Sequence, residues 1–513
     1  MMSILDFRKV FFEEIVKSKL GYTPWIVAAP SHMANGFFRE IGGGHYYNNE
    51  VQHRAINAKL NPLPNERERF YKKYIRLSDQ KQKALQFMQE NPKQRQMLSQ
   101  SFRADKTVFP SINWSSYTLS HVQHTTNDNH DRDFGRWLTH VLQQGEKRPA
   151  YELLHLLLTQ GATKSADVPA ISDALSLMTL PLMEWDVKPN LRNYDYGLPA
   201  NLTCDASGRF ADPLVHTIRK AFDRLAENDR DSATRNGKLD ALRRMTTLAC
   251  FSFYLHLINI GEPLQGKLPL LLYLERDSQT LKRASQESYR LVRQSTDNFI
   301  YRIIKGKIEQ LNAIGAFGRW DNQEAIQQHI ERTIDWYSNK KEGSNSRLRE
   351  EAKVSQFKVN CQNFYDSYRR TTANHEIEAI ALALTDMVGM VFSETPATVA
   401  RALGVKIGLL TRGDRRENKA YELHPDLLEV LVRASIPVGE EWNIKELAKY
   451  WYEEFGILFG GLGDENQKLA EWEIAPIDVN ELKRNEQSLA QQLELSGYAQ
   501  SYADGIVSVS VER

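Results

Sequence analysis

Apolar residues recur at helical spacing along most of the chain, and the longest runs of this pattern lie in its middle third. Apolar positions three and four residues apart are typical of an amphipathic helix. The pattern predicts helices over 214–225, 239–260, 277–314 and 322–338, and the third is long enough for one long helix or an antiparallel pair. A further apolar helix is expected over Glu376–Val391. We therefore predict a mainly α, multi-domain helical protein whose C-terminal region is α+β.

Turn-forming residues indicate where the helical domains end. The clearest linker is Asn339–Ser346, because apolar residues vanish there while Asn, Gly, Ser and Lys concentrate. We expect five segments in chain order: an N-terminal helical domain over 1–133, a helical domain over 134–338, the linker over 339–346, a first C-terminal module over 347–436 and a second over 437–513.

The first C-terminal module combines helices with a hairpin. Thr395 is the expected N-cap of a short helix that Pro396 opens and Gly404 closes as a left-handed cap. Two short segments follow, Ile407–Thr411 and Ala420–Leu423, which are predicted as strands and flank a charged turn. The order of elements is helix, short helix, then hairpin.

This order resembles a winged helix, in which the tip of the hairpin supplies cations to phosphates. The candidate nucleic-acid-binding residues are therefore Arg412, Arg415, Arg416 and Lys419. A winged helix also needs a recognition helix, so either Pro396–Leu403 is that helix or the unit only imitates the fold. The alternative is a solvated turn, because exposed hairpin tips are usually charged in any protein.

The second C-terminal module repeats this mixture of helix and strand. Its elements are predicted as helices over 444–455 and 479–495 and a closing strand over 506–511. Asp478 and Glu481 are spaced as a capping box at the start of the second helix. The turn Asp504-Gly505 precedes the strand, and we expect a second winged-helix-like module.

Charge is nearly balanced over the 513 residues, with 66 Lys and Arg against 65 Asp and Glu, but it is unevenly distributed. Segment 54–106 has 13 bases against 5 acids, a difference of +8, which favours contact with nucleic acid. The second C-terminal module has 15 acids against 6 bases, a difference of −9. Such a surface repels phosphate, so this module is expected to dock a protein.

Several positions of this acidic module resemble accessory proteins of bacterial genome-defence (anti-phage) clusters. They are the helix end at Phe455-Gly456, Asn485 in the last helix, and the closing segment from Gly497-Tyr498 to Tyr502-Ala503-Asp504-Gly505. The resemblance covers only this C-terminal block of the chain. It implies a subunit of a multi-protein system, possessing no catalytic motif of its own.

Three segments have residue types that could form a metal-binding, catalytic or phosphate-binding site. The loop His121–Asp133 is dense in imidazoles and carboxylates that could bind a metal, but it lacks paired helical spacing and is expected to be a polar loop. Asp186 and Lys188 are spaced as in some magnesium nucleases, with Asp173 as an upstream acid, although Pro189 shortens any strand there. Gly42–Gly44 lacks the lysine of a phosphate-binding loop.

Composition points to a reduced, soluble, cytoplasmic protein: hydrophobic residues make up 41%, and the three cysteines lie far apart, without a C-x-x-C motif. We expect a non-enzymatic accessory subunit without cofactor, which contacts nucleic acid and docks an ATPase, helicase or nuclease subunit, and has no membrane contact. The alternatives are a metal-dependent nuclease and a helical scaffold that binds only protein.

Overall fold

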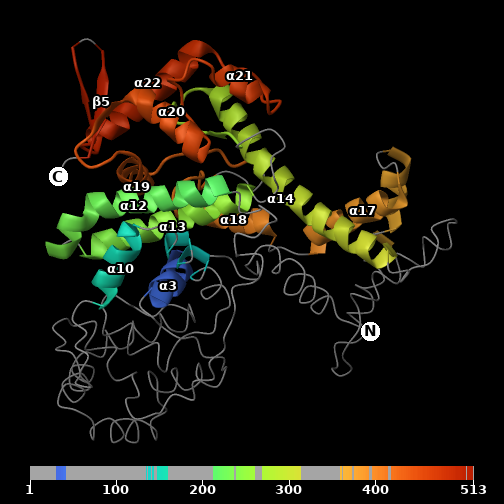
Figure 1. Cartoon of the computed structure of the whole chain (residues 1–513). Helices are drawn as coiled ribbons and strands as arrows, with labels where there is room; N and C mark the ends of the chain where they lie inside the picture. Colours follow the sequence, from blue (N-terminus) through green and yellow to red (C-terminus); the bar gives the residue numbers. More distant parts are fainter. Residues whose placement is uncertain are drawn as a thin grey trace, which may run out of the picture.

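The computed structural model describes residues 30–41, 135, 137–139, 141–143, 147–159, 212–235, 238–259, 268–313, 359–360, 362–371, 375–391, 395–413, 418–503 and 505–511. These residues form a mainly helical protein with a few short strands toward the C-terminus (Figure 1). The helices are α3 (Pro30–Ile41), α10 (Pro149–Thr159), α12 (Asp212–Arg235), α13 (Lys238–Asn259), α14 (Gln279–Ala313), α17 (Glu376–Val391), α18 (Pro396–Lys406), α19 (Pro425–Ser435), α20 (Ile444–Phe455), α21 (Glu465–Ala470) and α22 (Val479–Leu495). The strands are β1 (Leu270–Leu271), β2 (Glu441–Asn443), β3 (Ile457–Leu458), β4 (Ala499–Ser501) and β5 (Val507–Ser510).

The predicted helices of the middle third are confirmed where the structure describes them. The pattern over 277–314 is one long helix, α14, and not an antiparallel pair. Helix α12 extends ten residues past the predicted end at Leu225, to Arg235. The extension was missed because its sequence is polar, yet Asp229 within it is fully buried. The predicted helix over 322–338 lies outside the described residues.

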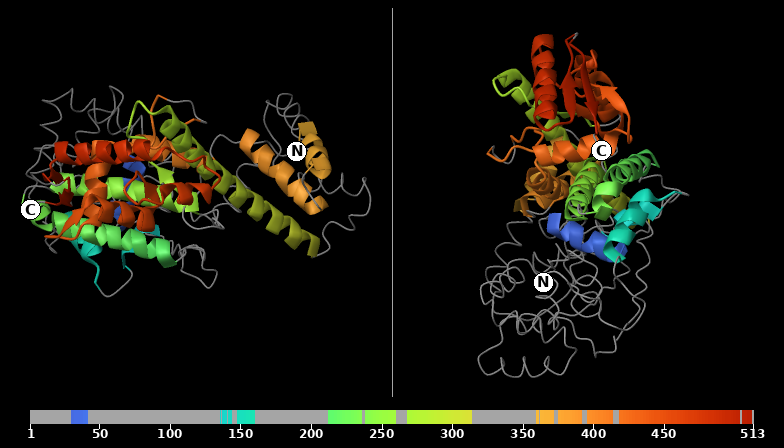
Figure 2. Two further views of the ribbon diagram at one scale, coloured as in Figure 1. Left: turned by 90° about the horizontal axis from the view of Figure 1, so that it is seen from above. Right: turned by 90° about the vertical axis from the view of Figure 1, so that its left-hand side faces the viewer.

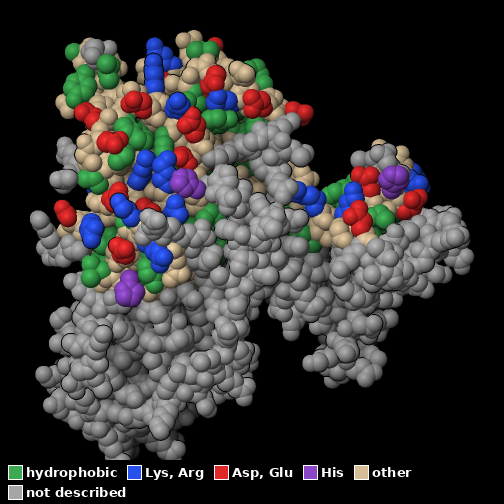
Figure 3. Space-filling model, viewed as in Figure 1, with side chains coloured by type: hydrophobic (Ala, Val, Ile, Leu, Met, Phe, Trp, Pro, Cys, Tyr) green, Lys and Arg blue, Asp and Glu red, His purple; other side chains and the backbone are tan. Residues whose placement is uncertain are grey.

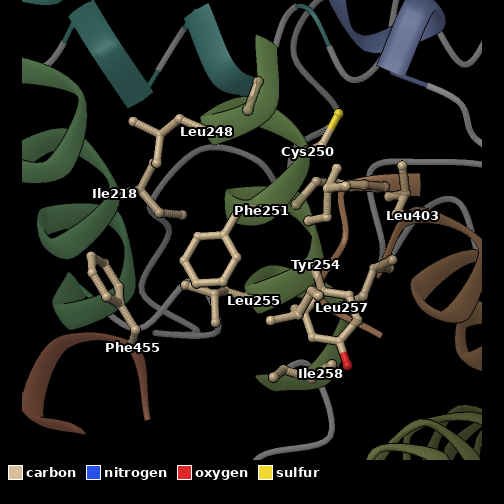
Figure 4. Packing of buried hydrophobic residues seen from close by; sticks show 14 of the residues in the cluster. Ile218, Leu248, Cys250, Phe251, Tyr254, Leu255, Leu257, Ile258, Leu403 and Phe455 are labelled. Atoms are coloured by element: carbon tan, nitrogen blue, oxygen red, sulfur yellow. The ribbon is translucent and has the colours of Figure 1, made fainter. Parts of the chain in front are cut away.

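Helix α13 forms the centre of the hydrophobic core. It packs against α12, against α3 on one side, and against α18 and α19 on the other. Figure 4 shows Phe251 of α13 beside Ile218 of α12 and Phe455 of α20. The Phe251 and Phe455 rings meet edge to face, with centroids 5.5 Å apart. Because partners surround its second half, residues 248–258 of α13 are all buried and nearly all apolar, as in a helix in the interior of a protein.

Helix α14 connects this core to a helical arm. Its first half lies beside β1, and its second half extends away from the body to pack along α17 (Figures 1 and 2). Tyr368, from the segment that precedes α17, donates a hydrogen bond of 2.5 Å to Asp386 of α17. A side-chain contact within the arm therefore joins α17 to the segment before it.

No described helix is long and apolar enough to cross a membrane.

A small mixed sheet joins segments that are far apart in the sequence. Strands β1 and β3 pair in parallel, with Leu270 opposite Ile457. Tyr421 continues the sheet on the other side of β1 through a parallel bridge to Leu272, and it also forms an antiparallel bridge with Leu410. The two bridges place the predicted hairpin at the edge of this sheet.

A second sheet closes the C-terminal part of the chain. Its strand order is β2-β5-β4, and both pairs are antiparallel. Val509 of β5 is fully buried between Trp442 of β2 and Ala499 of β4. The strand predicted over 506–511 is thus confirmed as β5, and the helices predicted over 444–455 and 479–495 are α20 and α22.

Two predicted helix ends need correction. Gly404 does not cap its helix, because α18 continues to Lys406 and Gly404 lies buried, where an added Cβ would be 2.7 Å from Leu410 Cδ1. Gly408 has the left-handed conformation instead, with φ +76°. At α22, the Asp478 side chain accepts from the backbone N–H of Asn480, while Glu481 accepts from the hydroxyl of Ser278, the residue before α14. The expected capping box is therefore replaced by a contact between the starts of two helices.

The predicted linker over 339–346 lies outside the described residues, and the domain boundaries stay a prediction. Described elements from both sides of it share one hydrophobic core. Helix α13 packs against α18 and α19, and β1 pairs with β3. Separation of these elements would expose the core of each.

Candidate functional site

The hairpin that was expected to carry a nucleic-acid site is present, although its arms pair only briefly. Thr411 N–H donates to the Ala420 carbonyl at 3.0 Å, and Glu422 N–H donates to the Leu409 carbonyl at 2.9 Å. Gly408 begins the hairpin, and an added Cβ there would lie 2.2 Å from the Cβ of His424. The close approach of the two arms therefore requires glycine at this position.

The described cations of the hairpin differ in exposure. Arg412 is exposed, and Lys419 is 5% exposed. The Lys419 ammonium donates to the carbonyl oxygens of Thr411, at 2.6 Å, and Arg412, at 2.9 Å. These two hydrogen bonds join the two arms of the hairpin at the base of the turn. Arg415 and Arg416 lie outside the described residues, and the assignment of all four cations to nucleic acid stays a prediction.

Helix α14 holds the returning arm of the hairpin. Gln286 of α14 donates to the carbonyl oxygen of Asn418 at 2.9 Å, and the exposed Arg290 donates to its side-chain oxygen at 3.3 Å. Arg276, which precedes α14, pairs with Glu422 at 3.1 Å. These contacts place two further exposed cations, Arg276 and Arg290, beside the hairpin, which the sequence pattern did not indicate.

A buried charge cluster joins α12, α13 and α19 beneath the C-terminal module. Asp229 accepts from Arg244 at 2.7 Å and from Arg433 at 3.2 Å. Glu429 accepts from Arg244 at 2.9 Å and from Arg243 at 2.8 Å. Sequence reasoning missed this cluster, because its members come from three separate helices and no local pattern relates them.

The pKa values of the two carboxylates in this cluster are shifted in opposite directions. Burial raises the pKa of Asp229, and the charges of Arg244 and Arg433 offset only part of that effect. Partial burial also opposes ionisation of Glu429, but Arg243 and Arg244 outweigh it and hold the pKa of that carboxylate below its ordinary value. A fully buried acid between arginines is a structural arrangement, and its removal would leave buried positive charge.

The buried amide of Asn485 joins α22 to the mixed sheet. Its oxygen accepts from the N–H groups of Leu274, at 2.8 Å, and Glu275, at 3.0 Å. Its nitrogen donates to the carbonyls of Leu272 and Phe459, each at 2.9 Å. Asn485 was one of the positions that carried the resemblance to defence accessory proteins. The structure gives it the role of a fully bonded polar group between elements.

The remaining candidate sites fall outside the described residues. These are the loop His121–Asp133, the acids and lysine at Asp173, Asp186 and Lys188, the glycines Gly42–Gly44 and the basic segment over 54–106. Within the described part of the chain, no group of three or more His, Cys, Asp or Glu side chains is placed to hold a metal ion. Cys250 is buried on α13, and burial raises the pKa of its thiol.

The chain was compared with protein-family models, with curated proteins and with solved structures, and none of these matches it.

Proposed function

We propose that this protein is a non-enzymatic accessory subunit of a bacterial multi-protein system that acts on nucleic acid, with antiviral defence as its setting. In this proposal the hairpin with Arg412, Arg415 and Arg416 contacts nucleic acid. The acidic module over 437–513 docks a partner enzyme, for which an ATPase, a helicase or a nuclease subunit is the expected class.

The observation that supports the proposal most strongly is the order of elements in the C-terminal part. Helix α19, strand β2, helix α20, helix α22 and the β4–β5 hairpin follow one another, and β5 lies between β2 and β4. A winged helix has the same order and the same antiparallel sheet. We therefore propose that 425–511 is a winged-helix-like module, with α21 and β3 inserted between α20 and α22.

Surface charge supports a different role for each hairpin, with nucleic acid at the hairpin over 407–424 and not at the β4–β5 hairpin. The β4–β5 hairpin occupies the position of the wing, yet 485–512 contains no Lys or Arg. A wing without cations gains nothing from phosphate, since counterion release requires positive charge. The exposed Arg412 and Arg290 lie instead around the hairpin at 407–424.

The test is duplex binding by the full chain as a function of salt. Reversal of Arg412, Arg415 and Arg416 to Glu should flatten the slope of log affinity against log salt by about 0.9 for each lost phosphate contact. The matched control replaces Lys445, Lys449 and Lys483 with Glu, because these exposed bases lie on the acidic module and the change in charge is the same.

The control variant should retain the slope of the unmodified protein. Equal losses in both variants would show that net charge, and not the hairpin, sets the affinity. A protein that binds no duplex at any salt concentration would leave only the protein-binding part of the proposal.

A further inference from the structure

The β4–β5 hairpin presents two large apolar side chains to solvent. Tyr502 and Ile506 are 46% and 52% exposed. They lie directly opposite each other, since Tyr502 N–H donates to the Ile506 carbonyl at 2.9 Å, and Gly505 with φ +81° closes the turn between them. An aromatic and a β-branched residue therefore form a cross-strand pair at the tip of the hairpin.

The strand register places this pair on the outer face of the sheet. Side chains alternate between the two faces along a strand, so Tyr502 shares its face with Gln500, and Ile506 shares its face with Ser508. The opposite face is occupied: Val509 is fully buried, and the hydroxyl of Ser501 donates to Glu494 of α22. The outer face of the tip has no such cover among the described residues.

An acidic side chain borders the exposed pair. Glu441 on the neighbouring strand β2 is exposed and accepts the hydroxyl of Ser508, the next residue after Ile506 on the same outer face. Glu440 lies on the other side, where its carboxylate accepts from the indole N–H of Trp442 at 3.0 Å. Figure 3 shows hydrophobic side chains gathered at the hairpin tip, at the upper left. The outer face therefore combines an apolar pair with a carboxylate border and, over 485–512, no cation.

Exposed large apolar residues concentrate in this part of the molecule. The large hydrophobic side chains that are exposed in the described residues are Leu156, Val359, Val479, Leu495, Tyr502 and Ile506. Three of these six, Leu495, Tyr502 and Ile506, lie at the C-terminal end of α22 or in the hairpin that follows it, whereas Val479 is at the opposite end of α22. Clusters of exposed apolar residues with a polar border are typical of interaction sites, and tyrosine is enriched among the residues that dominate binding energy.

We infer that the outer face of the β2–β5–β4 sheet binds a protein segment in which Lys or Arg side chains flank an apolar or aromatic one. The inference rests on the proposed function and specifies the partner's chemistry. Tyr502 and Ile506 pack against the apolar side chain of that segment, and Glu441 pairs with a cation beside it. Nucleic acid is disfavoured at this face, because its phosphates would meet the carboxylate of Glu441 and no cation over 485–512.

The experiment measures fluorescence anisotropy of labelled twelve-residue peptides on titration with the full chain. The probes are an alternating Lys/Leu peptide with a central Trp, its Glu/Leu counterpart and its Lys/Ser counterpart. The Lys/Leu peptide should bind, and the other two should bind at least tenfold more weakly. Glu441→Lys should weaken binding of the Lys/Leu peptide at least threefold and reduce the salt dependence of that binding.

The apolar contribution is tested by Tyr502→Thr with Ile506→Thr. Threonine preserves the preference for strand while it removes the apolar surface, so the hairpin is expected to persist. This variant should weaken the Lys/Leu peptide at least tenfold. The matched control is Leu156→Thr, which removes an exposed apolar side chain of α10 and should leave peptide binding unchanged.

Three outcomes would overturn the inference. They are unchanged peptide binding by the threonine variant, equal loss in the Leu156→Thr control, or equal affinity for the Glu/Leu peptide. Duplex binding by the same variants separates this inference from the proposed function. Loss of peptide binding with an unchanged salt slope on duplex supports the docking face, and loss of duplex binding by the threonine variant would make the hairpin a nucleic-acid wing.

Discussion

Replacement of Asn485 by alanine should lower the free energy of unfolding by about 4 kcal/mol. The side chain is fully buried and makes four hydrogen bonds, two as acceptor and two as donor. Alanine would leave four backbone groups without these partners. The N–H of Leu274 and the carbonyls of Leu272 and Phe459 belong to fully or nearly fully buried residues, whereas Glu275 is close enough to solvent for water to replace the lost bond.

The magnitude follows from the three groups on buried residues. Each buried group that loses its partner costs about 1–3 kcal/mol, so the three account for about 3–9 kcal/mol, and the prediction takes the lower part of this range because the chain can relax around the smaller side chain. The same helix offers a control in Asn480, whose residue is exposed. Asn480→Ala should change the free energy of unfolding by no more than about 0.5 kcal/mol.

The measurement is urea unfolding of the full chain, followed by circular dichroism, for both variants and the unmodified protein. Asn485→Asp extends the test, because a protonated carboxyl group can donate one hydrogen bond, whereas the ionised group would face two carbonyl oxygens. Its stability relative to the unmodified protein should therefore rise as pH falls. A loss below about 1 kcal/mol for Asn485→Ala would refute the reasoning, since the amide would then not be the link between α22 and the sheet.

Three further predictions concern the buried charges and the linker. Asp229→Ala should lower the free energy of unfolding in urea by about 3–5 kcal/mol, because it removes the buried carboxylate that Arg244 and Arg433 share and leaves Glu429 as the remaining carboxylate of the cluster; a loss under about 1 kcal/mol would contradict the cluster. Burial raises the pKa of Asp223 to about 6, above its value in the unfolded chain, so between these two values the folded protein binds the proton more tightly. The free energy of unfolding should therefore fall as pH rises from about 4 through about 6. Asp223→Asn should therefore raise the melting temperature at pH 7.5 and have little effect at pH 4, and a lower melting temperature at pH 7.5 would show that the ionised carboxylate is needed. Limited proteolysis should cut within 339–346, and the two fragments should co-elute in gel filtration, since β1 and β3 pair across the cut; fragments that elute separately would contradict the shared core.

Local sequence determined most of the helix boundaries. Glu376–Val391, Ile444–Phe455 and Val479–Leu495 begin and end at the predicted residues. Thr395 caps α18 as expected, accepting from the N–H of Thr398. Apolar periodicity and capping act over three or four residues, so a single segment contains the whole signal.

Tertiary structure decided which segments meet and which polar groups are buried. The polar end of α12 is stabilised as helix because Asp229 pairs with arginines on α13 and α19. Lys419 is buried at the base of the hairpin because its ammonium group donates to two backbone carbonyls. Gly404 was read as a helix end, and its true constraint is the side chain of Leu410 packed against it. In each case the contact comes from a residue outside the segment concerned, so the local pattern of apolar and polar residues cannot predict it.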